Sequence, residues 1–117
     1  MADRPLAARE RAALVGLVTG AMRRADAEQS LEELAGLAEA AGAAVVVRAL
    51  QERPTPDPAT FIGRGKAKSL ALACAEAGVD LVVVDNELTP AQLRELQKVV
   101  ACTVVDRTQL ILDIFAK

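Results

Sequence analysis

The sequence predicts an α/β fold, namely a single three-layer domain with a four-stranded parallel sheet flanked by helices on both faces. Three observations predict it. The chain has 117 residues, of which 52% are hydrophobic, and this suits one domain with one buried core. Its apolar runs are continuous rather than alternating, as in strands that are covered on both faces. These runs alternate with helical patterns, so right-handed crossovers favour a parallel sheet, for which we expect the strand order 2-1-3-4.

The chain is expected to begin with a disordered tail over residues 1–11, which are rich in arginine and alanine and contain Pro5. The domain then spans residues 12–117. Its first segment, residues 12–18 (AALVGLV), is a continuous apolar run, and we expect it to be the first buried strand.

The first helix is expected to follow a polar loop over residues 19–29. Ser30 and Glu33 have the spacing of a capping box, in which each side chain accepts from the backbone N–H of the other residue. We therefore expect the helix to begin at this pair. Gly42 suits the left-handed residue that ends a helix, and residues 44–50, centred on three valines, are expected to form a second buried strand.

A long connection over residues 51–64 precedes the second helix, and it exceeds the ~2–6 residues that are usual between a strand and a helix. Three prolines, at positions 54, 56 and 58, stiffen it, so less entropy is lost when it becomes ordered. Long ordered loops in such folds often carry function, although a plain surface excursion is the alternative. The helix that follows is expected to run to Ala77 and to end at Gly78.

The second half of the chain carries clear start signals for its helices. Residues 80–84 form the third apolar strand, and a capping box with proline in the first turn follows at Thr89, Pro90 and Gln92. Residues 102–105 form the fourth strand. The last helix is expected to be capped by the next three residues (DRT), and no glycine or proline ends it before Lys117, so we expect further chain downstream.

Composition excludes several classes of protein. The sequence has no histidine, which removes the usual general base and the commonest zinc ligand, and we find no catalytic or metal-binding motif. A formal net charge of −2 argues against a general nucleic-acid binder, so contact with phosphates requires a local basic patch. Cys74 and Cys102 are expected to be free thiols in a reduced, cytoplasmic setting. No stretch approaches the ~20 apolar residues of a membrane span.

The strongest candidate site is an anion-binding site at the start of the second helix. Glycines there leave backbone N–H groups accessible, the helix N-terminus supplies unpaired donors and a positive dipole, and three cations add charge. The alternative is a glycine-permitted turn that merely enters a helix. The candidate residues are Gly63, Arg64, Gly65, Lys66, Lys68 and Ser69.

This stretch equals no known nucleotide loop. In the G-x-x-x-x-G-K-[ST] pattern, Thr60 stands in place of the first glycine and Ala67 in place of the hydroxyl residue. The G-x-G-x-x-G pattern fails because Lys68 stands in place of its third glycine. The sequence therefore contains no signature of a catalytic nucleotide site.

Four further residues are secondary candidates, because the loops that follow parallel strands meet at one edge of the sheet. Asp85 and Glu87 follow the third strand, and Asp106 and Arg107 follow the fourth. The acids could form a metal or general-base pair, or they could stabilise the positive ends of the next helices. Asp106 and Arg107 could pair with each other or cap the last helix. Stabilising or capping the next helix is the simpler interpretation of these four residues.

Three segments together resemble one family closely: PDPATFIGRGK, DNELTPAQLRELQ and VVDRTQLILDIFA. They are similar, in order and in spacing, to the N-terminal domain of HflX-type GTPases. The similarity runs from about Leu14 to Lys117. The family's glycine-basic motif falls on residues 63–66 and its D-R-T motif on residues 106–108.

The resemblance implies an α/β domain that precedes a helical linker and a GTPase domain, in a cytoplasmic protein that binds the large ribosomal subunit and promotes ribosome splitting. The unfinished last helix would then begin the linker. GTP and Mg²⁺ would be bound outside this chain, which lacks the GTPase motifs and needs no cofactor of its own. ATP binding is also ascribed to this domain in the family, although no nucleotide signature supports it here.

Two functions therefore remain open. The first is an rRNA-binding domain that contacts the large subunit through the basic loop, without chemistry of its own. The second is a nucleotide-binding or phosphometabolite-binding α/β domain that uses the same loop for ATP or a small phosphorylated ligand.

Overall fold

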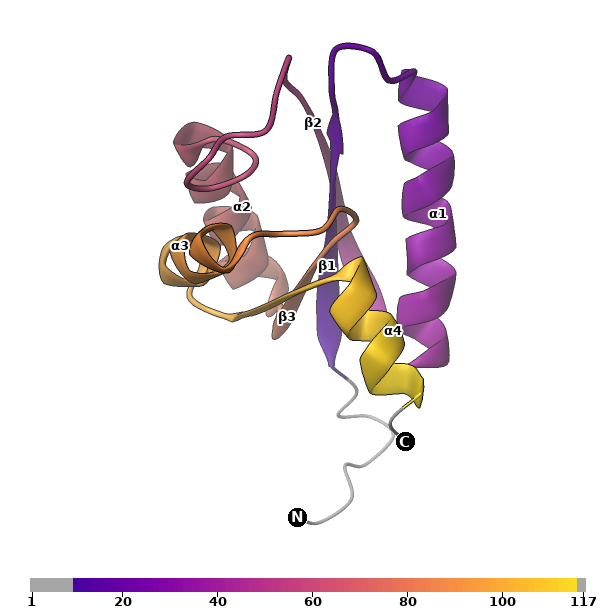
Figure 1. Ribbon diagram of the computed structural model, residues 1–117. Coiled ribbons are helices and arrows are strands. Elements are labelled where there is room, and N and C mark those ends of the chain that lie inside the picture. Colours follow the sequence, from indigo (N-terminus) through magenta and orange to yellow (C-terminus); the bar gives the residue numbers. More distant parts are fainter. Residues whose placement is uncertain (1–9, 116–117) are drawn as a thin grey trace.

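The structure, a computed structural model, describes residues 10–115 and contains one parallel sheet of four strands in the order β2-β1-β3-β4. Helices α1 and α4 cover one face of the sheet, and α2 and α3 cover the other (Figure 1). The predicted fold class and strand order are confirmed. The elements are β1 (Arg11–Val18), α1 (Arg24–Ala40), β2 (Ala44–Glu52), α2 (Arg64–Ala77), β3 (Leu81–Val84), α3 (Pro90–Val100), β4 (Thr103–Asp106) and α4 (Arg107–Phe115).

The ends of the chain bear on two expectations. Residues 1–9 of the predicted tail and residues 116–117 of the last helix lie outside the described residues. Arg11, which we placed in the tail, is instead the first residue of β1. Its backbone N–H donates to Asp80 Oδ2 over 3.1 Å and its Nε donates to the Ala77 carbonyl over 2.8 Å, so the start of the strand is fastened to the α2–β3 turn.

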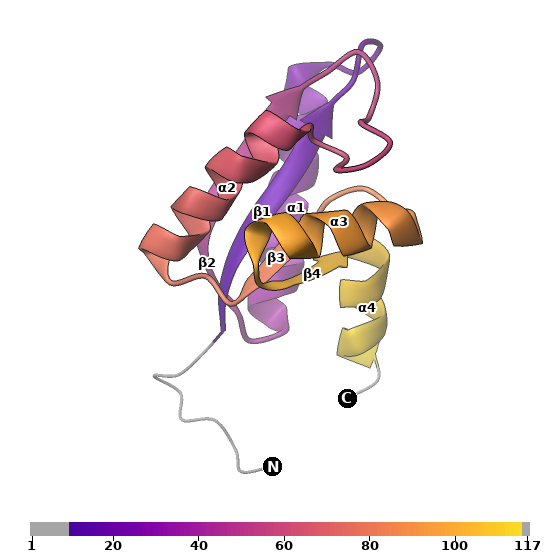
Figure 2. The same ribbon diagram turned by 90° about the vertical axis from the view of Figure 1, so that its left-hand side faces the viewer.

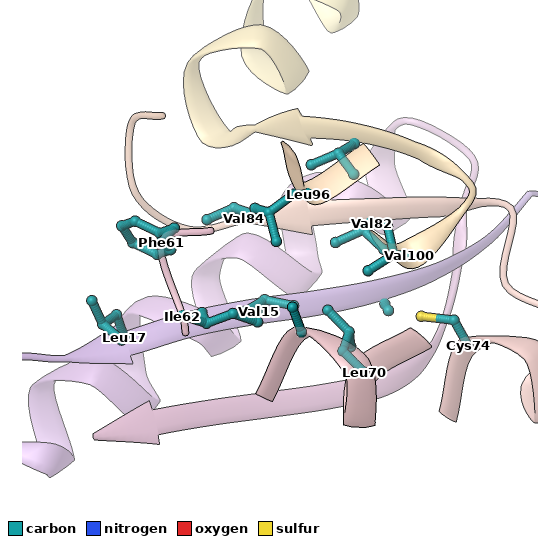
Figure 3. Packing of buried hydrophobic residues seen from close by; sticks show 13 residues of the cluster. Val15, Leu17, Phe61, Ile62, Leu70, Cys74, Val82, Val84, Leu96 and Val100 are labelled. Atoms are coloured by element: carbon teal, nitrogen blue, oxygen red, sulfur yellow. The ribbon is translucent and has the colours of Figure 1, made fainter. Parts of the chain in front are cut away.

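The hydrophobic core consists of two clusters, one on each face of the sheet. Side chains of β1 alternate between them, which explains why the apolar run of this strand is continuous: Val15 and Leu17 face α2 and α3, whereas Leu14 faces α1. Figure 3 shows the first cluster, in which residues of the loop before α2 pack against the sheet. No helix within residues 10–115 combines the length and the apolar character that crossing a bilayer requires.

The expectation of a buried second strand was wrong. β2 is an edge strand that is bonded only to β1, and most of its residues are half-buried or exposed. The register with β1 shifts between Ala12 and Ala13, where Val46 is the extra residue and is 37% exposed. A bulge of this kind twists a strand locally and is a common feature of sheet edges.

The predicted start of the first helix was also wrong. α1 begins at Arg24 after the N-cap residue Arg23, which makes no side-chain cap, and Ser30 lies inside the helix. The segment before Ser30 is rich in good helix formers, and Asp26 in the first turn favours the positive end of the helix dipole. These local preferences extend the helix upstream of the capping-box pattern.

The later helices begin as predicted. At α3 the Gln92 N–H donates to Thr89 Oγ1 over 3.1 Å, and the Thr89 N–H donates to Gln92 Oε1 over 3.0 Å, which completes the capping box. At α4 the Gln109 N–H donates to Asp106 Oδ1 over 2.9 Å, so Asp106 caps the last helix. Gly78 ends α2 with a φ of 66°.

Candidate anion-binding site

The candidate site is formed where the loop of residues 53–63 enters α2, on the side of the sheet that carries α2 and α3 (Figure 2). The loop leaves the carboxyl end of the edge strand β2 and returns to the sheet at the start of α2. Its shape depends on Asp57. Asp57 Oδ1 accepts from the N–H of Ala59 over 2.8 Å, and from the N–H and hydroxyl of Thr60 over 2.7 and 3.2 Å.

The Asp57 carboxylate is therefore a structural acceptor. The backbone hydrogen bond from Thr60, followed by that from Ala59, lowers the pKa of Asp57 below its usual 3.8. The backbones of Asp57 and Phe61 also exchange two hydrogen bonds of 2.9 Å, which closes the loop into a small hairpin. The loop thus has a fixed shape before any ligand binds.

The next three residues anchor the loop in the core. Thr60, Phe61 and Ile62 are 1%, 3% and 1% exposed, and Phe61 and Ile62 belong to the cluster on the α2–α3 face (Figure 3). Phe61 has a φ of 67°, and the Ile62 N–H donates to the Thr60 carbonyl over 2.6 Å, as in a γ-turn. Burying the Phe61 ring stabilises this uncommon backbone conformation.

Gly63 and Gly65 have different roles. Gly63 is the N-cap residue of α2 with a φ of 90°, and a Cβ there would lie 2.6 Å from Nη1 of Arg53. A side chain is therefore strained at this position. Gly65 is exposed, and a Cβ there would meet nothing within 4 Å. The sequence predicted that both glycines leave backbone N–H groups accessible to a ligand, and the structure adds that the backbone conformation of Gly63 itself favours glycine.

The first turn of α2 has no side-chain cap. The Ala67 N–H donates to the Gly63 carbonyl over 2.9 Å, whereas the N–H groups of Arg64, Gly65 and Lys66 have no acceptor among the described residues. These are the donors that every helix leaves unpaired at its N-terminus, and together with the helix dipole they favour an anion. α3 differs, because Pro90 in its first turn has no N–H and the Gln92 N–H donates to the Thr89 hydroxyl.

Three cations surround this helix start. Arg64 and Lys68 are exposed and Lys66 is half-buried, and within residues 10–115 none of the three side chains forms a hydrogen bond or an ion pair. At 3.6 residues per turn, Arg64 and Lys68 lie on one side of the axis and Lys66 lies about 160° away from both. The charges therefore encircle the end of the helix rather than forming one flat patch. Ser69 is exposed in the next turn.

The secondary candidates are mostly engaged within the fold. Arg107 Nε donates to Asp85 Oδ1 over 2.8 Å, and Arg107 Nη2 donates to the carbonyl and hydroxyl of Ser30 over 2.9 and 3.2 Å. Arg107 therefore pairs with Asp85 and not with Asp106, and it joins the start of α4 to α1 and to the residue that follows β3. Asp106 Oδ2 accepts from the Leu88 N–H over 3.1 Å.

Glu87 is exposed and has no partner within the described part of the chain. No group of three acids or thiols in residues 10–115 is placed to hold a metal ion. The two free thiols, Cys74 and Cys102, both pack in or against the cluster on the α2–α3 face. Their role in the fold is therefore that of core residues.

Two hollows lie near the carboxyl ends of the strands. A cleft of about 480 Å³ lies between the β1–α1 loop and the end of β2, and it is lined in part by Arg24, Glu52 and Arg53. A smaller hollow of about 90 Å³ lies between the ends of β1 and β3, where parallel sheets commonly bind ligands, and Asp26 and Asp85 line it. The smaller hollow is too small and too acidic for a nucleotide.

Comparison with known proteins decides the family. The sequence profile of the family described as "GTP-binding GTPase N-terminal" matches residues 28–116, which is most of the chain. The chain belongs to the HflX family of GTPases. It corresponds to the N-terminal domain of these proteins, as the resemblance of the three segments implies.

Relatives of this HflX-family domain come from bacteria and archaea. GTPase HflX of Flavobacterium psychrophilum is 41% identical over 92% of this chain and 26% of its own length. The Escherichia coli protein of the same name is 40% identical over 76% of this chain and 21% of its length, and that of Thermofilum pendens is 45% identical over 74% and 20%. The chain thus spans about a quarter of the length of the relatives it matches.

Solved structures share the fold. A GTP-binding protein from Sulfolobus solfataricus in complex with GDP has a TM-score of 0.67 and 20% identity, and the match covers 92% of this chain and 30% of that one. A further structure, described as a complex of SsGBP and GDP, has a TM-score of 0.70 and 19% identity over 92% of this chain and 29% of that chain. At such identities the likeness concerns the fold alone.

The three segments that mark the HflX-family domain are joined to one another by hydrogen bonds. Gln92 Nε2 of the second segment donates to the Asp57 carbonyl of the first over 2.9 Å. The Leu88 N–H of the second donates to Asp106 of the third, and Asp85 pairs with Arg107. Sequence reasoning missed these links, because no local pattern indicates a partner that is 18 to 35 residues away.

Proposed function

We propose that this domain contacts the large ribosomal subunit by binding rRNA phosphates at the start of α2, as part of a cytoplasmic HflX-type GTPase that acts in ribosome splitting. The helical linker and the GTPase domain, with its GTP and Mg²⁺, would lie outside this chain. The observation that carries the proposal is the uncapped, exposed start of α2, where unpaired N–H groups and three unpaired cations meet.

The electrostatics support a local contact. The formal net charge of the chain is −2, so long-range attraction to RNA is weak and the affinity must come from the contacts themselves. Arg64, Lys66 and Lys68 need not break an internal ion pair before they bind a phosphate. The anchored loop fixes the start of α2, so little conformational entropy is lost on binding.

The proposal gives this domain no catalytic step. Arg64, Lys66 and Lys68 act as charges, Gly65 leaves space for a phosphate near the backbone donors, and the Ser69 hydroxyl can donate at the rim. Displacement of condensed cations from RNA by about three side chains predicts a slope of about −2 to −3 when log K is plotted against log salt concentration.

The test compares two variants with the same net charge. The first neutralises the site (Arg64→Gln, Lys66→Gln and Lys68→Gln). The second adds three negative charges to exposed positions of α1 (Ala25→Glu, Gln29→Glu and Ala40→Glu). Binding of each to purified large ribosomal subunits is measured as a function of salt, with circular dichroism to check the fold.

We expect the α2 variant to lose most of the salt dependence and at least about 100-fold in affinity at 0.1 M salt, because three phosphate contacts disappear. The α1 variant should retain both. Equal binding by a folded α2 variant and the unchanged chain would overturn the proposal. Equal losses in both variants would also overturn it, since net charge would then explain them.

A second candidate function, binding of ATP or a phosphorylated metabolite, is favoured by the cleft of about 480 Å³, whose volume lies in the range of ligand pockets. Its cations are already neutralised, since Arg24 pairs with Glu52 over 2.8 Å and Arg53 lies 3.8 Å from Asp57. A bound ligand should raise the melting temperature. If millimolar ATP causes no shift, this alternative is rejected.

A further inference from the structure

Most of the unpaired positive charges of the described residues belong to one of the two helix layers. Residues 10–115 contain eleven arginine and lysine side chains, and six of them bond to acids or to backbone carbonyls. The other five form no hydrogen bond or ion pair with the described residues. Four of these five belong to α2 and α3, namely Arg64, Lys66, Lys68 and Arg94. The fifth, Arg23, precedes α1.

The charges of whole helices follow the same division. α2 carries three cations and one acid, and α3 carries two cations and one acid, which gives this layer +3. α1 carries one cation and five acids, and α4 carries one of each, which gives the opposite layer −4. The sheet therefore separates a basic layer from an acidic one, although the chain as a whole is acidic. Such a field turns one side of a protein toward a polyanion and the other side away.

We propose that the RNA-binding surface extends from the start of α2 onto α3, and that Arg94 is a further phosphate-binding residue. This inference rests on the proposed function and adds a second helix and a direction of docking to it. The α2–α3 layer faces the RNA, and the acidic α1 layer faces away from it.

The fold connects the two parts of this surface. Gln92, two residues before Arg94, donates to the Asp57 carbonyl over 2.9 Å, so the first turn of α3 is held against the loop that leads into α2. Figure 2 looks onto this layer and shows both helices starting on the side of the loop. Arg94 is exposed, whereas Lys98, one turn further on, is paired with Glu95 over 3.2 Å. Arg94 is thus the free cation of α3.

The chemistry of the surface indicates contacts to phosphates rather than to bases. Stacking on bases requires exposed aromatic rings, and the chain has two phenylalanines, of which Phe61 is 3% exposed and anchors the loop. The α2–α3 layer also exposes Leu72, which is 70% exposed. This residue distinguishes RNA from an acidic protein partner. A protein partner would bury such an apolar side chain at the centre of its interface, whereas a phosphate backbone would not.

The experiment compares single variants of the full chain for binding to purified large ribosomal subunits across a salt series. Arg94→Gln removes the proposed contact. Arg23→Gln is the matched control. Arg23 is also unpaired and exposed, and its substitution removes the same charge, but Arg23 precedes α1 in the opposite layer. Leu72→Ser tests the alternative partner. We expect Arg94→Gln to bind about 5- to 10-fold more weakly at ~0.1 M salt and to lower the magnitude of the salt slope by about 1.

Arg23→Gln and Leu72→Ser should bind like the unchanged chain. If the triple variant of α2 (Arg64→Gln, Lys66→Gln and Lys68→Gln) loses binding but Arg94→Gln binds as tightly as Arg23→Gln, this inference is overturned and the proposed function stands. If neither the α2 variant nor Arg94→Gln changes binding, both are overturned. A loss in Leu72→Ser that exceeds the loss in Arg94→Gln would assign the layer to a protein partner and reject the RNA surface.

Discussion

At the scale of single residues, Gly63 and Gly65 separate what the fold requires from what a ligand would require. Gly63 has a φ of 90°, and a Cβ there would lie 2.6 Å from Arg53, whereas a Cβ at Gly65 would meet no atom within 4 Å. We expect Gly63→Ala to lower the free energy of unfolding by about 1–3 kcal/mol. Gly65→Ala should be neutral or raise it by up to about 1 kcal/mol, because alanine favours the helix.

Urea unfolding followed by circular dichroism measures both changes. A Gly63→Ala variant as stable as the unchanged chain would contradict the strained geometry of this N-cap. Gly65→Ala, which should not destabilise the fold, should nevertheless weaken phosphate binding. It adds a methyl group beside the unpaired N–H donors at the start of α2.

Asp57 predicts a pH dependence of stability. Its pKa is lowered below 3.8 by hydrogen bonds from Thr60 and Ala59, so the folded state favours the carboxylate. The resulting stabilisation is fully present above the unfolded pKa of about 3.8 and is lost as the pH falls through the folded value. Asp57→Asn should therefore destabilise the domain at pH 7, and the difference from the unchanged chain should shrink below about pH 4.

The measurement is urea unfolding of both proteins between pH 7 and pH 2.5. Asp113→Asn is a suitable control, since Asp113 is exposed and bonds only to Gln109 within the described residues. A constant difference between Asp57→Asn and the unchanged chain over this pH range would show that the Asp57 charge does not stabilise the loop.

At the scale of elements, α3 is held by two kinds of contact that mutation can separate. Thr89→Ala removes one half of the capping box and should cost about 1 kcal/mol. Gln92→Ala removes the other half and also the bond to the Asp57 carbonyl, and Gln92 is 7% exposed. It removes two part-buried hydrogen bonds and should cost about 2 kcal/mol.

Urea unfolding gives the free energies, and hydrogen exchange of the residue 53–63 amides shows whether the loop loosens. Gln29→Ala is the matched control, because Gln29 is an exposed glutamine on α1 and its change should stay within about 0.5 kcal/mol. If Gln92→Ala costs no more than Thr89→Ala, the link between α3 and the loop contributes nothing to stability.

Elements were predictable from the sequence where their signals are local. Thr89, Pro90 and Gln92 lie within one turn, and they gave the start of α3 correctly. The start of α1 was missed because Arg23 makes no side-chain cap. Val46 belongs to an edge strand, and an apolar run indicates a strand without indicating how many neighbours it has.

In the candidate site, too, only the features with local sequence signals could be predicted. The position of residues 63–66 at the start of a helix could be predicted, because glycines and a helical pattern adjoin there. The pairing of Asp85 with Arg107 could not, since the two residues are 22 positions apart and meet only when β3 and β4 lie side by side. Whether the start of α2 binds an anion stays a prediction.

At the scale of the whole molecule, the two core clusters share one sheet, so we expect the domain to unfold as a single unit. β1 contributes side chains to both clusters, and Arg107 joins α4 to α1 and to the end of β3. If one helix layer opened, the core side chains that the strands direct toward that layer would be exposed, and the sheet that also supports the other layer would be weakened. Thiol chemistry can test this expectation without a new probe.

Cys74 lies in the cluster on the α2–α3 face and is 3% exposed. Burial, followed by the nearby Cys102 thiol, raises the pKa of Cys74 to about 11. At pH 8 the reactive thiolate is then about 100-fold scarcer than for an ordinary cysteine, and access requires unfolding. In a Cys102→Ser variant, we expect a thiol reagent to label Cys74 at a rate that rises with urea in step with the unfolding seen by circular dichroism.

A Cys74→Ser variant that retains the half-buried Cys102 is the control, and it should react faster in the folded state. The comparison of the two urea dependences decides the question. Labelling of Cys74 well below the unfolding transition would mean that α2 opens separately from the sheet. The rigid start of α2 would then be lost too, because the residues that anchor the loop pack in the same cluster as Cys74.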